Sequence, residues 1–203
     1  MDSAALLVIR DDADIEEALA ITREAGFDVK EVIRVKRVDS KCYLGPASLE
    51  KVKSIANDNG IKRLCIYDEV KPRHITCLMK ELGVDVVDRV LMILSIFQEH
   101  AGSKEARLQI EMARLRHQLP LVRDWIRRVK LGELPGFLSL GRYAVDVYYR
   151  HITKRISKLK AELEKLRRKR SLERELRRRQ GFIHIAIAGY TNAGKTTLFN
   201  ALT

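Results

Sequence analysis

The stretch FIHIAIAGYTNAGKTTLFNALT occupies residues 182–203. Its first seven residues form an apolar run of the kind that builds a buried strand, and Leu198 begins a helical pattern. Between them, Gly189-x-x-x-x-Gly194-Lys195-Thr196 fits the phosphate-binding loop pattern. The stretch therefore predicts a strand, a phosphate-binding loop and a helix. The alternative is a chance glycine turn, which the flanking strand and helix patterns disfavour.

In such a loop, successive main-chain N–H groups and the N-terminus of the following helix surround the phosphates. Lys195 would reach the β- and γ-phosphates, and the Thr196 hydroxyl would hold Mg²⁺. The predicted nucleotide-binding residues are Gly189, Tyr190, Thr191, Asn192, Ala193, Gly194, Lys195, Thr196 and Thr197. Residues 181–203 then form the truncated start of a P-loop NTPase domain. We expect no catalytic residue among them and almost no hydrolysis by the 203-residue chain alone.

Composition favours a folded protein that does not cross a membrane. Hydrophobic residues make up 46% of the chain, as in a globular domain, yet the longest dense apolar run, residues 91–97, is too short to cross a bilayer. The start of the chain lacks the basic residues of a signal peptide. Cys42, Cys65 and Cys77 show no CxxC spacing, so we expect reduced thiols in a cytoplasmic protein, without a disulfide or a zinc site.

Residues 1–100 alternate between strand and helix patterns. Predicted strands occupy residues 4–9, 29–38, 61–67 and 84–88, and predicted helices occupy residues 14–25, 48–56 and 72–82. This alternation is typical of an α/β domain with a parallel sheet.

Few residues of this domain suggest a site. Asp68 and Glu69 follow the third predicted strand, at the edge where open α/β sheets bind ligands, but they also suit a solvated loop that caps the next helix. His74 is expected at the surface, since no nucleophile accompanies it. Asp88 and Arg89 suggest either an internal ion pair or a functional one. An enzymatic role for this domain alone has only Asp68 and Glu69 in its favour.

Residues 101–180 carry two heptad ladders of equal length. Apolar residues recur at alternating spacings of four and three from Leu108 to Val129 and again from Val145 to Leu166. Glycines and a proline between them predict a loop at residues 131–143 and hence an antiparallel helical hairpin. Each helix of roughly 27 residues would be about 40 Å long. Pro120 predicts a kink or a short interruption in the first helix.

Basic residues are concentrated in the second half of the chain. Residues 1–100 contain 15 Lys and Arg against 18 Asp and Glu, whereas residues 101–203 contain 24 against 9. This excess favours contact with RNA phosphates over a merely solvated helix face. The candidate RNA-binding residues are Lys165, Arg167, Arg168, Lys169, Arg170, Arg177, Arg178 and Arg179. The alternative is a protein–protein or dimerisation arm; the narrow apolar seam disfavours a membrane-surface helix, and we expect a monomer.

Several short motifs are distributed along the chain from about residue 43. They are Tyr43-Leu44-Gly45 with Leu49-Glu50, Asp68-Glu69-x-x-Pro72-Arg73, Leu82-Gly83-Val84-x-Val86-x-Asp88-Arg89, Ile93-Leu94-x-Ile96-Phe97, Ala106-Arg107-Leu108-Gln109-Ile110-Glu111-x-Ala113-x-Leu115 with Leu119-Pro120, and the phosphate-loop segment Gly189 to Asn200. Together they resemble the motifs of the HflX-type ribosome-associated GTP-binding proteins. The phosphate loop is generic, but Asp88-Arg89 together with the block from Leu108 to Pro120 is more specific.

The resemblance implies a GTPase that binds the large ribosomal subunit, with an α/β N-terminal domain, a helical hairpin and a GTP-binding domain. It implies GTP or GDP with Mg²⁺ at Gly189 to Thr196, and ribosomal RNA as the partner of the hairpin. Guanine specificity comes from the resemblance alone. Two features depart from the family pattern: Pro46-Ala47-Ser48 stands where a glycine and a lysine are usual, and the loop 131–143 is not the expected glycine-rich loop.

Overall fold

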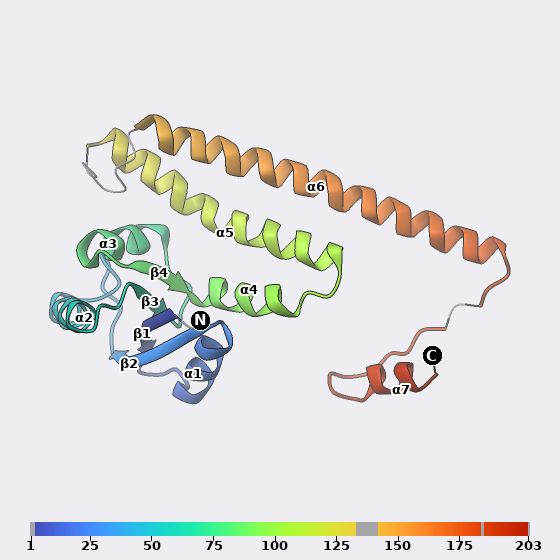
Figure 1. The fold of residues 1–203 in the computed structure, drawn as a ribbon, viewed down its shortest axis with the longest axis horizontal. Helices are drawn as coiled ribbons and strands as arrows, with labels where there is room; N and C mark the ends of the chain where they lie inside the picture. The colour runs from blue at the N-terminus through green and yellow to red at the C-terminus, as the bar shows by residue number, and fades with distance from the viewer. Residues whose placement is uncertain (1–2, 133–141, 184, 203) are drawn as a thin grey trace. The chain divides into compact units, whose positions relative to one another are not determined.

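The structure, a computed structural model, describes residues 3–132, 142–183 and 185–202 (Figure 1). The chain divides into two compact units, Met1–Leu163 and Glu164–Thr203. Most of the predicted loop 131–143 lies outside the described residues. The elements are β1 (Ser3–Arg10), α1 (Ile15–Glu24), β2 (Phe27–Val35), α2 (Pro46–Asp58), β3 (Arg63–Ile66), α3 (Pro72–Leu82), β4 (Asp85–Asp88), α4 (Arg89–His100), α5 (Lys104–Lys130), α6 (Arg142–Arg179) and α7 (Lys195–Leu202).

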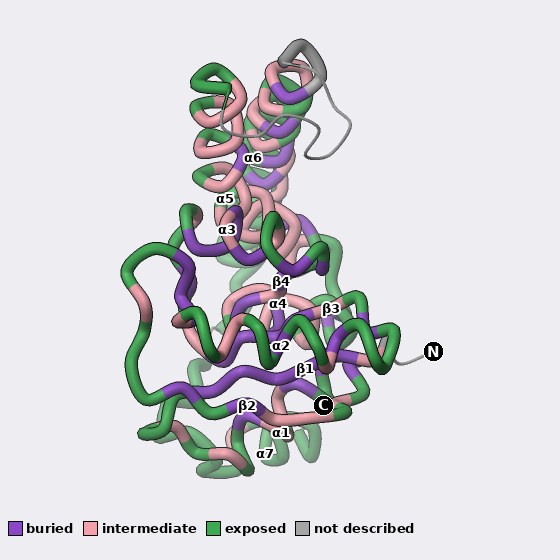
Figure 2. The backbone as a smooth tube through the Cα atoms, turned by 90° about the vertical axis from the view of Figure 1, so that its left-hand side faces the viewer, coloured by how far each residue is buried: buried purple, intermediate pink, exposed green. Residues whose placement is uncertain are grey.

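Four strands form the predicted parallel sheet in the order β2-β1-β3-β4. Side chains of a strand alternate between the two faces of a sheet. On one face Leu6 and Val8 of β1 join α2 and α3 in one core, and on the other Leu7 and Ile9 join α1 and α4 in a second. Figure 2 shows β1 as buried along most of its length. The fold of this part is therefore the predicted α/β fold, with helices on both faces.

Helix ends follow local signals in the sequence. Helix α3 spans the predicted residues, and Gly83 ends it in the left-handed region with φ of 67°. The Asp14 side chain accepts hydrogen bonds from the first turn of α1. Helix α4 was not predicted, because its apolar run has no clear helical period; Asp88 caps it by accepting a hydrogen bond from the Leu91 N–H.

Helices α5 and α6 confirm the antiparallel hairpin. Val122 of α5 is buried in one cluster with Val145 and Ile152 of α6. At the other end of the contact, Arg155 donates two hydrogen bonds to the Glu111 carboxylate, at 2.6 and 2.8 Å. Pro120 lies inside α5, and the helix continues through it, so of the predicted kink or short interruption the interruption is absent. Helix α6 is longer than predicted, with 38 residues. Among the described residues, no helix is long and apolar enough to span a membrane.

Polar contacts fix α5 to the α/β domain. The Asp88 carboxylate is fully buried and accepts a hydrogen bond from the His117 ring of α5 at 2.6 Å. This bond raises the pKa of His117 above its ordinary value of 6.5. The suggested Asp88–Arg89 ion pair does not form, because Arg89 pairs with Glu17 at 3.2 Å.

Two further predictions in this domain are wrong. His74 is buried, with its Nε2 3.0 Å from the Ser40 carbonyl oxygen, because α3 presses it against the loop before α2. Cys42 and Cys77 form a disulfide rather than reduced thiols, since the fold brings their Cα atoms to 5.2 Å. Only Cys65 is a free thiol, and it is buried.

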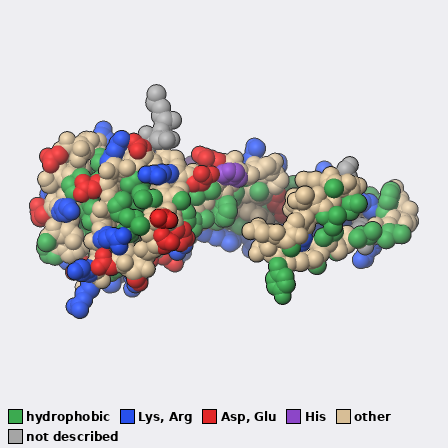
Figure 3. Space-filling model, turned by 90° about the horizontal axis from the view of Figure 1, so that it is seen from below, with side chains coloured by type: hydrophobic (Ala, Val, Ile, Leu, Met, Phe, Trp, Pro, Cys, Tyr) green, Lys and Arg blue, Asp and Glu red, His purple; other side chains and the backbone are tan. Residues whose placement is uncertain are grey.

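The predicted strand at residues 182–188 is also absent. Its described residues pair with no strand, and Ile183 and Ile185 are each 87% exposed. A strand needs a neighbour to satisfy its main-chain groups. Figure 3 shows the hydrophobic side chains of the segment around α7 at the surface. The apolar run is strand-like in sequence but lacks a sheet to join.

Substitution of His117 is expected to give a pH-dependent loss of stability. His117→Gln removes a charged donor from the buried Asp88 carboxylate, at a cost of about 1–3 kcal/mol. Because the folded-state pKa of His117 is raised, its stabilisation is fully present below pH 6.5 and is lost as the pH rises through the folded-state pKa. Thermal unfolding of both proteins should show a gap in Tm that narrows as the pH rises. A gap that stays constant contradicts this prediction.

Reduction of the disulfide is expected to destabilise the α/β domain. The bond closes a segment of 35 residues, and constraint of an unfolded loop of that length is worth roughly 3–4 kcal/mol. Alkylation of the denatured chain without reductant should modify Cys65 alone, and all three cysteines after reduction. The Cys42→Ser variant should unfold at lower temperature than the oxidised chain and at the same temperature with or without reductant. Three modified cysteines in the unreduced chain would show that the bond does not form.

Candidate functional site

The phosphate-loop segment adopts a tight turn that ends in α7. Asn192 and Gly194 lie in the left-handed region, with φ of 59° and 75°. The Tyr190 carbonyl oxygen accepts hydrogen bonds from the Ala193 N–H and from the Lys195 ammonium group. Helix α7 begins at Lys195, and its first main-chain hydrogen bond runs from the Leu198 N–H to the Gly194 carbonyl oxygen at 2.9 Å. The helix that the sequence predicts after the loop is therefore present.

This geometry fits a bound phosphate chain. The N–H groups of residues 195–197 precede the first intrahelical bond, so they have no intrahelical acceptor and suit an anion. A Cβ at Gly189 would lie 3.8 Å from the Lys195 Cδ, so the lysine side chain crosses the loop beside this glycine. Thr196 stands in the first turn of α7, where the sequence pattern places the Mg²⁺ ligand. The assignment of these residues to nucleotide and Mg²⁺ stays a prediction.

The predicted basic residues all lie on the exposed second half of α6. Three of them pair with glutamates one turn away: Arg168 with Glu164, Lys169 with Glu173, and Arg179 with Glu175. Lys165, Arg167, Arg177 and Arg178 have no carboxylate partner among the described residues. These four keep their full charge for an external anion.

One basic residue of α6 was missed in the sequence. Arg174 is exposed and lies four residues before Arg178 and four after Arg170, so the three share one helix face. Arg167 precedes Arg170 by three residues and extends the row. We call Arg167, Arg170, Arg174 and Arg178 the arginine row; it spans about 16 Å at 1.5 Å per residue. Its spacing of three, four and four is readable in the sequence and would have identified Arg174.

Asp68, a candidate ligand-binding residue in the sequence, is occupied by hydrogen bonds within the protein. Asp68 accepts hydrogen bonds from the Tyr43 hydroxyl at 3.1 Å and from the Glu69 N–H at 2.8 Å. Tyr43 is buried, has φ of 64°, and its pKa is raised by burial and by the Asp68 carboxylate. Asp68 does not cap α3, whose cap residue is Lys71. Asp68 therefore anchors Tyr43 across the ends of the strands rather than forming an open catalytic site.

Known protein families match almost the whole chain. Residues 12–98 match the family described as GTP-binding GTPase N-terminal, and residues 100–177 match the GTP-binding GTPase middle region. Residues 184–203 match the family described as 50S ribosome-binding GTPase. A GTPase HflX of Hyperthermus butylicus is 50% identical over 194 residues, which is 94% of this chain and 52% of that protein. This chain belongs to the HflX family.

Other HflX proteins and solved structures agree. The GTPase HflX of Saccharolobus solfataricus is 39% identical over 205 residues, which is all of this chain and 56% of that protein. A crystal structure of a GTP-binding protein from Sulfolobus solfataricus in complex with GDP has 33% identity and a TM-score of 0.61, and covers 99% of this chain and 53% of its own. The chain thus spans about half the length of the HflX relatives it matches.

Replacement of Gly194 is expected to weaken nucleotide binding. Alanine at φ of 75° costs about 1–2 kcal/mol, so Gly194→Ala should distort the loop and reduce affinity by about tenfold. Gly181→Ala is the matched control, since Gly181 has φ of 81° outside the loop. Binding of a fluorescent GDP analogue is measured on HflX protein that carries the complete nucleotide-binding domain. Equal loss in both variants would mean that general strain, rather than the loop, sets the affinity.

Proposed function

We propose that the protein carrying this chain is a GTPase of the HflX family that docks on RNA of the large ribosomal subunit through α6. The arginine row is the observation that carries the proposal. It presents cations on one exposed helix face, and no described residue from Glu164 to Leu202 is buried. Phosphate groups are the ligands that exposed arginines attract, and Arg167 and Arg178 have no carboxylate partner among the described residues. The match of residues 184–203 to a family described as 50S ribosome-binding supports the ribosome as the source of that RNA.

The second part of the proposal concerns the nucleotide. Residues Gly189 to Thr197 bind the phosphates of GTP or GDP, with Lys195 on the phosphate oxygens and Thr196 as the ligand of Mg²⁺. Guanine as the base is supported by the GDP named for the solved relatives. Hydrolysis requires groups outside the phosphate loop, so it belongs to the complete protein, in the cytoplasm where ribosomes are found.

RNA recognition by α6 depends on backbone and shape. The basic half of the helix carries arginines and lysines without interleaved aromatic residues, so stacking of bases on aromatic side chains does not contribute. Phosphate contacts position a protein without reading sequence. We therefore expect affinity that falls steeply with salt and tolerates changes in RNA sequence.

Replacement of three of the four arginines in the row is expected to abolish most of the binding to ribosomal subunits. The triple variant Arg167→Gln, Arg174→Gln and Arg178→Gln loses three phosphate contacts and should bind at least about tenfold more weakly, with a shallower salt dependence. The control variant Arg23→Gln, Arg34→Gln and Arg37→Gln has the same net charge but changes exposed arginines of the α/β domain. Co-sedimentation with isolated large subunits at about 50 and 200 mM salt measures both.

Two outcomes would contradict the proposal. If both triple variants bind equally, net charge rather than the row attracts the subunit. If no protein sediments with subunits and the chain instead self-associates, α6 is a dimerisation arm. Leu172 and Leu176, exposed one turn apart on α6, are then the first residues to replace.

A further inference from the structure

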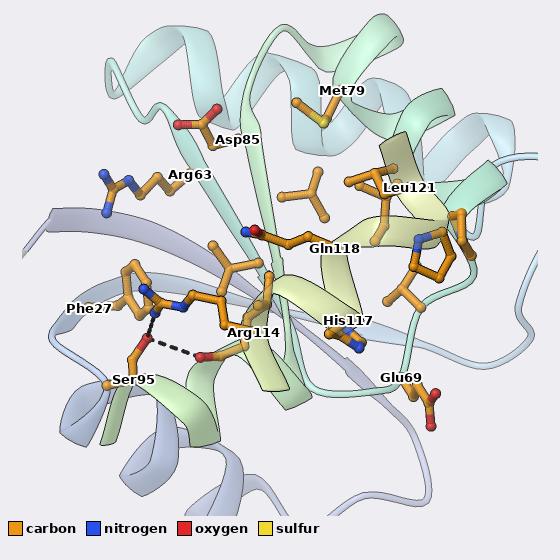
Figure 4. A pocket seen from close by; sticks show the side chains of 18 of the residues that line it. Phe27, Arg63, Glu69, Met79, Asp85, Ser95, Arg114, His117, Gln118 and Leu121 are labelled. Carbon is orange, nitrogen blue, oxygen red and sulfur yellow. Dashed lines mark hydrogen bonds between the residues drawn. The ribbon is translucent and has the colours of Figure 1, made fainter. Parts of the chain in front are cut away.

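A hollow of about 1080 Å³ lies beside β4, one of the two edge strands of the sheet. Helices α3, α4 and α5 supply its walls, and all of its lining residues belong to the unit Met1–Leu163. Figure 4 shows side chains from these helices and from the sheet converging on it. Its volume is that of a pocket for a small organic molecule. Neither the phosphate loop nor the arginine row contributes to it.

Several large apolar side chains line the hollow. They are Phe27, Ile75, Met79, Leu91, Leu121 and Trp125. An apolar wall of this kind favours the apolar body of a ligand over water, because burial of apolar surface is favourable on both sides.

Arg114 is the polar group of the hollow that most clearly needs a ligand. It extends from α5, is only partly exposed, and donates a hydrogen bond to the Ser95 hydroxyl at 2.8 Å (Figure 4). Among the described residues it has no carboxylate partner. His117, one turn further along α5, is by contrast neutralised by Asp88. A guanidinium group held in this way offers its remaining N–H donors to a carboxylate in two-point geometry.

Polar groups of two more residues at the hollow have no hydrogen-bond partner among the described residues. The Asp85 N–H donates to the Lys62 carbonyl and the Arg89 N–H to the Asp68 carbonyl, so odd-numbered residues of β4 face β3. Val86 therefore turns its main-chain N–H and C=O away from β3, along the free edge that borders the hollow. The Trp125 Nε1 is buried and has no hydrogen-bond partner in the described structure. Buried unpaired groups of this kind are rare unless a ligand or water completes them.

The charges around the hollow select a ligand with a single charge. Besides the neutralised His117, its lining has three cations, Arg63, Lys71 and Arg114, and three carboxylates, Glu69, Asp85 and Glu99. The three carboxylates belong to exposed residues, whereas Arg114 is only partly exposed. A polyphosphate would meet three negative charges on entry, but a single carboxylate would not need more than Arg114.

We propose that this hollow is a binding site for a small amphiphilic carboxylate. The carboxylate lies on the Arg114 guanidinium group, the apolar body lies against Leu121 and Trp125, and a polar group on the ligand meets the free main-chain groups of Val86. The site is independent of the proposed GTPase function, since it shares no residue with it.

The single tryptophan of the chain makes the site directly observable. Titration of the 203-residue chain with phenylbutyrate should change the fluorescence of Trp125 in a saturable way. The neutral analogue phenylbutyramide should bind about tenfold more weakly, because it lacks the charge that Arg114 holds. Arg114→Gln should weaken the binding of phenylbutyrate by a similar factor and leave the binding of phenylbutyramide unchanged. Arg116→Gln changes an exposed arginine of the same helix and should alter the binding of neither ligand.

The alternatives have distinct results. Arg114→Lys keeps the positive charge but loses the two-point geometry of the guanidinium group, and it serves as a second variant if Arg114→Gln unfolds. Circular dichroism and a melting curve of each variant show whether its fold is intact. A linear, non-saturating response to phenylbutyrate, or equal affinity for acid and amide in the wild type, overturns the proposal. Competition by pyrophosphate at lower concentration than by phenylbutyrate would overturn the carboxylate assignment in favour of a polyanion.

Discussion

The buried Asp88 carboxylate holds the sheet and two helices together. It ends β4, caps α4 through the Leu91 N–H and accepts the His117 hydrogen bond from α5. Burial of a carboxylate costs free energy unless each of its oxygens accepts a hydrogen bond. The Leu91 N–H and the His117 ring therefore both contribute to keeping Asp88 buried. Asp88 thus fixes both α4 and α5 beside β4, and residues of both helices line the hollow there. The hollow therefore follows from the way the helices are attached.

The sequence predicted the elements whose boundaries depend on local chemistry. Helix α3 begins at a proline and ends at Gly83, two signals that act within a single turn, and its predicted and observed bounds agree. The parallel sheet followed from the alternation of strand and helix patterns, and the hairpin from its heptad spacing. Helix α7 was also predicted, because the phosphate-loop pattern and the apolar residues after it are contiguous in the sequence. The assignment of nucleotide to this loop was predicted from the sequence and stays a prediction.

The wrong predictions depend on contacts between distant residues. Cys42 and Cys77 become neighbours only when α3 packs beside the loop before α2, and the same packing buries His74. The run 182–188 is strand-like, but a strand is completed by a partner that no local pattern supplies. Val86 shows why the hollow could not be predicted from the sequence. Its unpaired main-chain groups follow from the position of β4 at the edge of the sheet, and strand order is not encoded within any one strand.

Helix α6 has a packed first half and a solvated second half. The packed half explains why the solvated half can stay helical. Up to Leu163 the helix buries apolar residues such as Ile152 and Leu159, and beyond that point none of its residues is buried. An isolated basic helix of that length would be marginal in water, because starting a helix costs more than extending one. Here the packed half provides the start, and the pairs between glutamates and basic residues one turn apart add support to the extension. This half of α6 can therefore remain ordered without buried side chains, which leaves its arginines exposed to a partner.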